Sequence, residues 1–466
     1  MSIRDTEKNV TEDTIAAIST AMGIGAIGMV RISGSKALHI ADKIFTSSDR
    51  QKPSKTPSHR ILHGHICANK ATIDEVLVTV MRAPHTYTRE DVIEISGHGG
   101  MLSLRKILEE IIRHGARMAT AGEFTKRAFL NGRLDLSQAE AVVDVINAET
   151  EYGLELAVNH LKGELSTHIL KLKNDILDFY CPLEVAIDFP EEGIIGYSQS
   201  DVKKRINKAI KGLKALIETR NDGRKVRSGI DVVIAGATNV GKSSLFNLLI
   251  KEDKSIVTHV HGTTRNVLED VVVLDGMLYK IADTAGLRKT KGVVERIGIK
   301  QTEKKVVEAD VILYIIDNNK GPTRDDKLFL KNANKKKIII VINKIDLKRH
   351  KDIKKIVKEY TCIEISAKKH IGTENVINEL VRRGKKHIPQ KKIIKNTFII
   401  NERQYEALVK AQTSLQNAQK ALTKKLSYEF IAFDIKNTMQ ALGEITGDDI
   451  TEETLHAIFS RFCIGK

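Results

Sequence analysis

The chain of 466 residues is too long for a single compact core and predicts about two to four domains, and its 41% hydrophobic and 29% charged residues are ordinary for a globular protein. Its longest apolar runs, such as 338–342, have strand length and exclude a membrane span, and the first residues lack a secretory signal, so we expect a cytoplasmic protein. The 75 Lys and Arg against 59 Asp and Glu leave a net charge of +16, which favours RNA as a partner, although a lysine-rich genome would give the same excess.

Residues 1–131 mix short apolar runs with helical stretches and predict a small α+β domain. The predicted strands include 26–32, 75–81 and 92–95. From 132 to 226 the pattern is helical, because apolar residues recur every three or four positions. They form one stripe over 154–176 and another over 202–217, separated by a break at 188–193. Long helices with one apolar face need neighbours, so a helical bundle is predicted.

Residues 227–391 alternate between strands, turns and helices. Continuous apolar runs at 232–235, 311–316 and 338–342 predict parallel strands that are buried on both faces. Helical texture returns over 392–466. We infer an α/β domain inserted into a helical domain, whose two halves pack together because neither half looks large enough to bury its own stripe.

The clearest motif lies directly after the predicted strand 232–235. Residues 236–243 read Gly-Ala-Thr-Asn-Val-Gly-Lys-Ser, the GxxxxGK[ST] pattern of a phosphate-binding loop. Its backbone N–H groups and the following helix N-terminus would face the phosphates, Lys242 would reach the outer two, and Ser243 would ligate Mg²⁺.

Further motifs identify the nucleotide as GTP. Asp283-Thr284-Ala285-Gly286 follows a strand and is placed to hold Mg²⁺ through water and to sense the γ-phosphate. Asp346, in Asn343-Lys344-Ile345-Asp346, can accept hydrogen bonds from N1 and N2 of guanine, a donor pair that adenine lacks. Ser366-Ala367-Lys368 completes the base pocket. The whole predicted nucleotide site comprises Asn239, Val240, Gly241, Lys242, Ser243, Ser244, Thr258, His259, Val260, His261, Gly262, Thr263, Thr264, Asp283, Thr284, Ala285, Gly286, Asn343, Lys344, Asp346, Ser366, Ala367 and Lys368.

Thr264, in the switch segment 262–265, is the expected second Mg²⁺ ligand. Thr264 and Lys242 are both expected to be catalytic residues. Many GTPases carry a Gln directly after the glycine at position 286, but this chain has Leu287. An apolar side chain cannot orient the attacking water, so we expect slow hydrolysis by the isolated domain. A GTPase that no longer hydrolyses GTP remains the alternative.

Blocks along nearly the whole chain resemble the MnmE (TrmE) family of tRNA-modifying GTPases. Besides the nucleotide motifs, the resemblance rests on 13–17, 30–34, 97–100, 122–136, 188–190, 294–299, 442–447 and 458–466. It implies a multidomain fold: an N-terminal α+β folate-binding-like domain that dimerises, a helical bundle, and an inserted Ras-like P-loop GTPase domain. It also implies a homodimer that works, as a heterotetramer, with the FAD-containing flavoprotein MnmG (GidA). Together they would add an aminomethyl or carboxymethylaminomethyl group to C5 of the wobble uridine of certain tRNAs.

The resemblance further implies two cofactors. A tetrahydrofolate derivative would supply the one-carbon unit, bound by Arg31, Glu94, Arg133 and Lys466, which otherwise would be surface charges. Potassium ions would activate hydrolysis on dimerisation of the GTPase domains, held by Asn239, Thr258, Val260 and Thr263, with Glu295 as the catalytic residue that positions the water.

The chain departs from the family at several positions. Ala21–Gly25 replaces a Pro-Pro-Gly-Arg-Gly loop near the folate residues, and Gln404 stands where the family often has His. His259, His261 and Asn266 are also unusual, and two histidines beside the ion predict weaker K⁺ dependence than in a His259→Asp/His261→Ala variant. Cys463 lies beside the folate-binding end, but we favour a small buried hydrophobic side chain over a catalytic one.

Two other functions would share part of this pattern. A ribosome-assembly GTPase that binds RNA and performs no modification chemistry would share the GTP motifs and the charge, but it would need neither Gly97–Gly100 nor Phe462–Lys466. A P-loop ATPase or kinase is disfavoured by Asp346. Four scattered cysteines without a CxxC pair predict neither a zinc site nor disulfides.

Overall fold

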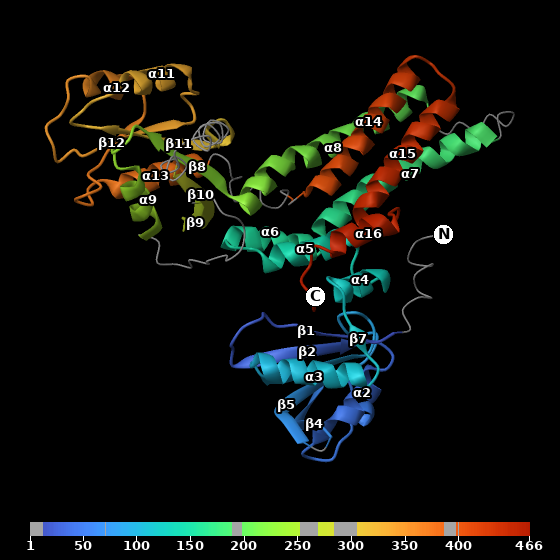
Figure 1. Ribbon diagram of the computed structural model, residues 1–466. Helices are drawn as coiled ribbons and strands as arrows, with labels where there is room; N and C mark the ends of the chain where they lie inside the picture. The colour runs from blue at the N-terminus through green and yellow to red at the C-terminus, as the bar shows by residue number, and fades with distance from the viewer. Residues whose placement is uncertain are drawn as a thin grey trace, which may run out of the picture. The chain divides into compact units, whose positions relative to one another are not determined.

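The computed structural model describes residues 13–69, 71–188, 198–251, 269–283, 305–385, 398 and 400–466. The chain divides into two compact units (Figure 1). The first takes in Met1–Ile146, Ala157–Ile217 and Glu402–Lys466, and the second takes in Asn147–Leu156 and Glu218–Asn401. No helix within the described residues is long and apolar enough to cross a membrane.

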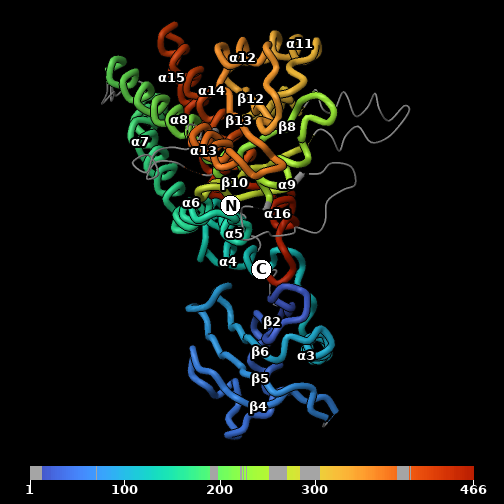
Figure 2. Tube along the Cα trace, turned by 90° about the vertical axis from the view of Figure 1, so that its left-hand side faces the viewer, coloured from blue at the N-terminus to red at the C-terminus, as the bar shows by residue number. Residues whose placement is uncertain are grey.

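The first unit begins with a seven-stranded sheet in the order β3-β4-β5-β6-β2-β1-β7, in which the middle strands lie side by side (Figure 2). All pairs are antiparallel except β1 with β7. The strands are β1 (Ile15–Ile18), β2 (Ile27–Ser33), β3 (Phe45–Ser47), β4 (Arg60–Ala68), β5 (Ala71–Met81), β6 (Val92–His98) and β7 (Arg117–Met118).

Two helices cover one face of this sheet: α2 (Ala37–Ile44) and α3 (Met101–Arg113). Apolar side chains that alternate along β2 and β6, such as Val30, Ile32 and Ile95, are buried against them. The residues between these positions, among them Arg31 and Glu94, therefore point to the other face of the sheet. A short helix η1 (Pro53–Lys55) follows β3.

The helical part of the first unit combines the middle and the end of the chain. Helix α15 packs on both α14 and α7, and Figure 1 shows α8 running beside α14. The helices are α4 (Glu123–Leu130), α5 (Leu136–Ile146), α6 (Glu151–Leu161), α7 (Glu164–Asp188), α8 (Gln199–Ser228), α14 (Glu402–Thr423), α15 (Tyr428–Thr446) and α16 (Glu452–Phe459). The start of α6, up to Leu156, and the end of α8, from Glu218, belong to the second unit.

One ion pair joins the two helical segments across a long sequence separation. Arg403 on α14 donates from Nε and Nη2 to the Glu140 carboxylate on α5, at 2.9 and 2.7 Å. The fully buried Gln404 donates to the same carboxylate at 2.6 Å. Gln404, which stands where the family often has His, is thus a hydrogen-bond donor inside the bundle and not a surface residue.

The single apolar stripe predicted over 154–176 is wrong in detail. The chain forms two helices, α6 and α7, separated at Gly163, whose φ of +89° is a left-handed conformation that favours glycine. Leu165, Ile169 and Ile176 are buried on α7, whereas Leu154 on α6 is 43% exposed. Periodicity alone missed the break because the spacing of apolar residues happens to continue across it.

The second unit contains a six-stranded sheet in the order β13-β12-β11-β8-β10-β9. It is parallel except for β9, which forms an antiparallel hairpin with β10 through the turn at Asp275-Gly276. The strands are β8 (Ile230–Gly236), β9 (Glu269–Leu274), β10 (Met277–Asp283), β11 (Val311–Asp317), β12 (Ile338–Asn343) and β13 (Cys362–Glu364).

Helices cover both faces of this sheet, so the central strands are buried throughout. They are α9 (Lys242–Lys251), α11 (Arg324–Asn332), α12 (Ile353–Glu359) and α13 (Thr373–Gly384). The predicted fold class is confirmed: an α+β domain, a helical bundle and an α/β domain. The predicted domain boundaries at 131, 226 and 391 stay predictions, and the second unit reaches back to Glu218 on α8.

Candidate functional site

The phosphate-binding motif forms the turn between β8 and α9. Gly236 has a φ of +142°, and a Cβ there would lie 2.4 Å from the carbonyl oxygen of Ile315 on β11. Gly241 has a φ of +103°, and its Cβ would lie 2.2 Å from Nδ2 of Asn343. Both positions therefore require glycine, because the loop passes close to the neighbouring strands.

Lys242 begins α9 and is turned back into this loop. Its Nζ donates to the carbonyl oxygens of Gly236 and Ala237, at 3.1 and 2.6 Å, and the residue is only 7% exposed. These two hydrogen bonds hold the buried ammonium group inside the phosphate-binding loop.

Next to it, Ser243 and Asp283 meet at the carboxyl end of the sheet. The Ser243 hydroxyl donates to Oδ2 of Asp283 at 2.9 Å, and Asp283 is 2% exposed at the end of β10. Oxygen ligands of this kind suit Mg²⁺, which takes few protein ligands and keeps several waters. Among the residues that the structure describes, no group of three His, Cys, Asp or Glu forms a metal cluster.

The predicted base-binding motifs are tied to the phosphate loop through Asn343. This residue is 2% exposed, and its Nδ2 donates to the Val240 carbonyl oxygen at 2.8 Å. Its Oδ1 accepts from the backbone N–H groups of Lys344 and Ala367, at 2.8 and 3.0 Å. One amide side chain thus links three loops that are more than a hundred residues apart at their extremes.

Lys344 makes a second link, with a residue that the sequence analysis did not single out. Its Nζ donates to the Asn239 carbonyl oxygen at 2.8 Å and to Oδ2 of Asp317 at 2.7 Å. Burial raises the pKa of Asp317, but hydrogen bonds from Lys344 and from two backbone N–H groups outweigh it and lower the pKa below its usual value. Asp317 ends an apolar strand in register with Asn343, and that position was the available sequence signal.

The carboxylate expected to read the base is positioned by the third motif. The hydroxyl of the fully buried Ser366 donates to Oδ1 of Asp346 at 2.6 Å, and this hydrogen bond lowers the pKa of Asp346. Asp346 itself is exposed, as a group that contacts a ligand must be. Ala367, next to Ser366, is buried, and Lys368 is exposed.

Part of the predicted site lies outside the described residues. This holds for the catalytic candidate Glu295, for the predicted Mg²⁺ ligand Thr264 and for the predicted K⁺ ligands Thr258, Val260 and Thr263. It holds equally for His259, His261, Gly262, Asn266, Thr284, Ala285, Gly286 and Leu287.

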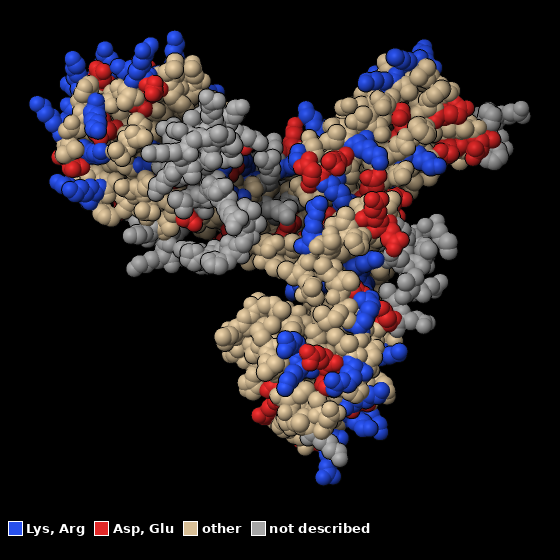
Figure 3. Space-filling view, viewed as in Figure 1, with Lys and Arg blue, Asp and Glu red and all other residues tan. Residues whose placement is uncertain are grey.

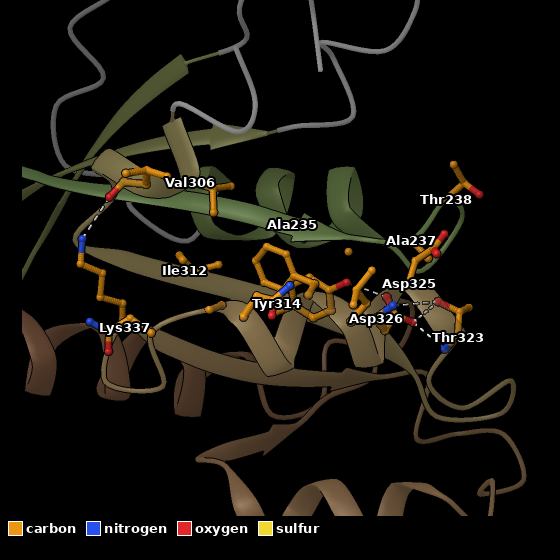
Figure 4. Close-up of a pocket in the computed structure, with 17 residues that line it drawn as sticks. Ala235, Ala237, Thr238, Val306, Ile312, Tyr314, Thr323, Asp325, Asp326 and Lys337 are labelled. Atoms are coloured by element: carbon orange, nitrogen blue, oxygen red, sulfur yellow. Dashed lines mark hydrogen bonds between the residues drawn. The ribbon is translucent and has the colours of Figure 1, made fainter. Parts of the chain in front are cut away.

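A cavity of about 1040 Å³ is lined in part by residues of the phosphate loop (Figure 4). Its wall includes Ala237 and Thr238 of the loop, Tyr314 of β11 and Phe329 of α11. The Tyr314 hydroxyl donates to Oδ1 of Asp326 at 2.6 Å, and its ring stacks on Phe329. No residue of the two base-binding motifs lines this cavity, so it is not the base pocket.

The four residues predicted to bind folate all lie in the first unit, and Arg31 and Glu94 lie on the sheet face opposite α2 and α3. Arg31 and Glu94 are register partners on β2 and β6, and Nη2 of Arg31 lies 2.7 Å from Oε1 of Glu94. Their side chains are only 13% and 19% exposed, so they are not ordinary surface charges.

Tyr87 brings Arg133 to this pair. The guanidinium carbons of Arg31 and Arg133 lie 5.4 and 4.7 Å from the centre of its ring. The Tyr87 hydroxyl shares a hydrogen bond of 2.9 Å with the Thr125 hydroxyl on α4. Sequence reasoning missed Tyr87, because a lone aromatic residue in a loop carries no motif.

The C-terminus reaches the same sheet. A Cβ on Gly465 would lie 2.4 Å from the carbonyl oxygen of Ile18 on β1, so the last residues pack closely on that strand. Lys466 is half-buried. Ala17, which precedes Ile18 on β1, is the register partner of Arg31 on β2. The structure thus gathers Arg31, Glu94 and Arg133 and brings Gly465, the residue before Lys466, to the adjoining strand.

The interpretation of Cys463 as a small buried side chain is wrong, because Cys463 is exposed. The tail alternates: Phe462 and Gly465 are buried, while Cys463 and Ile464 face outward. The Cys463 carbonyl oxygen accepts from Gly122 N–H at 3.3 Å, so its backbone, and not its side chain, anchors the tail.

The fold and the first site define a P-loop protein with a guanine-type base pocket, which is the architecture of a GTPase. Sequence models of two domain families match the chain: "GTP-binding protein TrmE N-terminus" over residues 14–133 and "MnmE helical domain" over residues 136–463.

Whole-length relatives agree with these matches. The "tRNA modification GTPase MnmE" of Alkaliphilus metalliredigens is 43% identical over 98% of this chain and 99% of its own length. The protein of the same name from Clostridioides difficile is 42% identical over the same shares. The chain therefore belongs to the MnmE family. Among solved structures, Aquifex aeolicus Era is 27% identical over 40% of this chain and 66% of its own, with a TM-score of 0.27, too low to support a structural comparison.

Proposed function

We propose that this chain hydrolyses GTP as part of a tRNA modification enzyme. The observation that carries the proposal is the linkage of three loops by Asn343, which joins the phosphate loop to both base-binding motifs in a chain matched along its length by MnmE proteins. Membership of this family implies guanine nucleotides, Mg²⁺ and tRNA as ligands.

In the proposed GTPase site each described residue has one task. The backbone of 237–241 and the ammonium group of Lys242 bind the phosphates, and Asp346 accepts the two guanine donors. The hydroxyl of Ser243 and the carboxylate of Asp283 fit Mg²⁺ and, with Thr264, would hold it. Mg²⁺ bound there neutralises charge that develops on the phosphate oxygens.

The finer parts of the mechanism rest on the family resemblance. Glu295 would position the water in place of the missing Gln, and Asn239, Thr258, Val260 and Thr263 would hold K⁺. Potassium supplies positive charge where other GTPases use an arginine. GTPase-domain dimerisation would complete this arrangement, and the two histidines of 258–263 would weaken its dependence on K⁺.

The first unit would bind a tetrahydrofolate derivative as the one-carbon source. The paired Arg31 and Glu94, the aromatic ring of Tyr87 and the exposed Arg133 fit a ligand with a flat ring and an acidic tail. With an FAD-containing flavoprotein partner, the enzyme would build an aminomethyl or carboxymethylaminomethyl group on C5 of the wobble uridine.

The test is mass spectrometry of bulk tRNA from cells that lack this protein, complemented by the wild type or by Lys242→Ala. We expect C5-modified wobble uridine to disappear and to return with the wild type only. Unchanged modification in the deletion strain would instead support a ribosome-assembly GTPase, and ribosomal subunit profiles from the same cells would then show the defect.

A further inference from the structure

The positive charge of this chain is concentrated on one part of the second unit. Residues 320–360 hold 14 Lys and Arg against five Asp and Glu, a net +9 in a chain whose total is +16. Figure 3 shows Lys and Arg side chains crowded over the part of the second unit that holds α11 and α12. A genome-wide lysine bias would spread the excess along the sequence and does not explain this concentration.

A groove of about 410 Å³ runs between α11 and α12 within this surface. We call it the lysine groove. It is lined by Pro322, Lys327, Leu330, Lys331, Lys335, Asp352, Lys355, Ile356, Glu359 and Tyr360. Lysines enter it from both sides, because 327 and 331 lie one helical turn apart on α11 and 355 lies on α12. Its floor is apolar, formed by the buried Leu330 and Ile356.

An aromatic ring lies at the end of the lysine groove. Nζ of Lys335 is 4.8 Å from the centre of the Tyr360 ring, and the Tyr360 hydroxyl donates to the Leu330 carbonyl oxygen at 3.0 Å. That hydrogen bond fixes the ring, so its face is held ready for a flat or cationic group. A flexible lysine over such a face is easily displaced by a nucleobase, which stacks on it.

Most of the lysines of this surface form no ion pair within the part of the chain that the structure describes. Lys327 pairs with Asp352 at 3.3 Å, but Lys331, Lys354 and Lys358 form no ion pair with any residue that the structure describes. All three are exposed. Uncompensated ammonium groups at this density repel one another, and an anionic partner relieves that repulsion.

We propose that the lysine groove and the lysines around it are a binding surface for tRNA, with phosphates on Lys331, Lys354, Lys355 and Lys358 and an unpaired base on Tyr360. RNA accounts for the ring and the charges together, whereas an acidic protein surface would account only for the charges. This inference rests on the proposed function and names a surface that recognises its macromolecular substrate.

The surface shares no residue with the predicted nucleotide site. GTP hydrolysis in the absence of tRNA therefore does not depend on it, and the two activities can be separated by mutation. The test compares full-length Lys331→Gln/Lys355→Gln with the matched control Lys43→Gln/Lys106→Gln, which removes two exposed lysines from α2 and α3. The probe is a tRNA transcript with uridine at the wobble position, titrated from 50 to 200 mM KCl.

We expect the affinity of the Lys331/Lys355 variant for this transcript to fall roughly tenfold at 100 mM KCl, because two phosphate contacts are lost. The plot of log affinity against log salt should become shallower by about 1.5, while the control keeps the wild-type slope. A Tyr360→Leu variant should weaken binding roughly tenfold without changing the slope, since stacking releases no counterions. Hydrolysis of GTP without tRNA should stay at the wild-type rate in all three.

Wild-type affinity and slope in the Lys331/Lys355 variant would overturn the proposal, as would equal losses in the control. Loss of binding to polyglutamate with unchanged tRNA binding would assign the surface to an acidic protein and also overturn it. These failures are distinct from failure of the proposed function. If only the surface proposal fails, deletion of the protein still abolishes wobble-uridine modification. If the proposed function fails, deletion leaves that modification unchanged.

Discussion

Replacing Asn343 by Ala should disable nucleotide binding although the side chain need not touch the nucleotide. The change leaves the carbonyl oxygen of Val240 and the N–H of Ala367 without the partner that each now has, and both residues are largely buried. An unsatisfied buried backbone group costs about 1–3 kcal/mol, so with two such groups the ordered arrangement of the three loops should lose on the order of 2–6 kcal/mol.

Because a bound nucleotide needs all three loops in place, this loss should appear in its affinity. We expect the Kd for GDP to rise on the order of a hundredfold, the equivalent of about 2.7 kcal/mol. Titration with a fluorescent GDP analogue at low temperature measures it, and a thermal melt shows whether the domain remains folded.

Asn318→Ala is the matched control. Asn318 is as buried as Asn343 and follows the neighbouring strand β11, but its Nδ2 donates to Leu347 and not to the phosphate loop. It should lower the melting temperature and change GDP affinity by less than about threefold. GDP affinity within twofold of the wild type for Asn343→Ala, or equal losses for both variants, would refute the reasoning.

Three further changes probe the first unit. Gly465→Ala places a Cβ 2.4 Å from the Ile18 carbonyl oxygen at a φ of +97°, so the affinity for 5-formyltetrahydrofolate should fall roughly tenfold while GTP hydrolysis stays unchanged. The control is Gly115→Ala, at a φ of +108° but in open space, which should leave the affinity for 5-formyltetrahydrofolate unchanged. Burial raises the pKa of Glu123, but hydrogen bonds from Arg117 and Thr120 and the charge of Arg127 lower it to about 2. The ionised Glu123 therefore stabilises the fold fully above pH 4.5, and this contribution is lost as the pH falls towards 2. Glu123→Gln should cost on the order of 2 kcal/mol of unfolding free energy at pH 7. Calorimetric scans at successive pH values should show the difference in stability between wild type and variant shrinking in acid. Gln404→Ala should destabilise the helical bundle by about 1–2 kcal/mol in urea unfolding by removing a donor from the partly buried Glu140 carboxylate, and an unchanged midpoint would contradict that role.

The fold of the second unit could be predicted well because its phosphate loop and its strands are each encoded by a short contiguous stretch of sequence. The loop at 236–243 contains glycines where the backbone passes close to β11 and Asn343. The buried parallel strands correspond to unbroken apolar runs in the sequence. The position of Asp317 at the end of an apolar strand is visible in the sequence, but its ion pair with Lys344 is not, because that pair depends on the register that sets β11 beside β12.

In the first unit the misses have a common physical origin. Tyr87 acquires its place only when β2 and the segment after α4 meet around it, and the direction of Cys463 depends on the tail lying against Gly122. The break at Gly163 is set by one left-handed residue that leaves the apolar spacing intact. Contacts between distant segments leave no periodic trace in the sequence.

The most direct test of the account is the nucleotide preference of Asp346→Asn. Asp346 is held by Ser366 to accept two donors from guanine, whereas an asparagine offers one acceptor and one donor, which match the carbonyl group that xanthine carries instead of the amino group. The wild type should hydrolyse GTP and neither ATP nor XTP. The variant should lose roughly a hundredfold in kcat/KM for GTP and prefer XTP. A variant that still prefers GTP, or a wild type that hydrolyses ATP as well as GTP, would contradict the central claim.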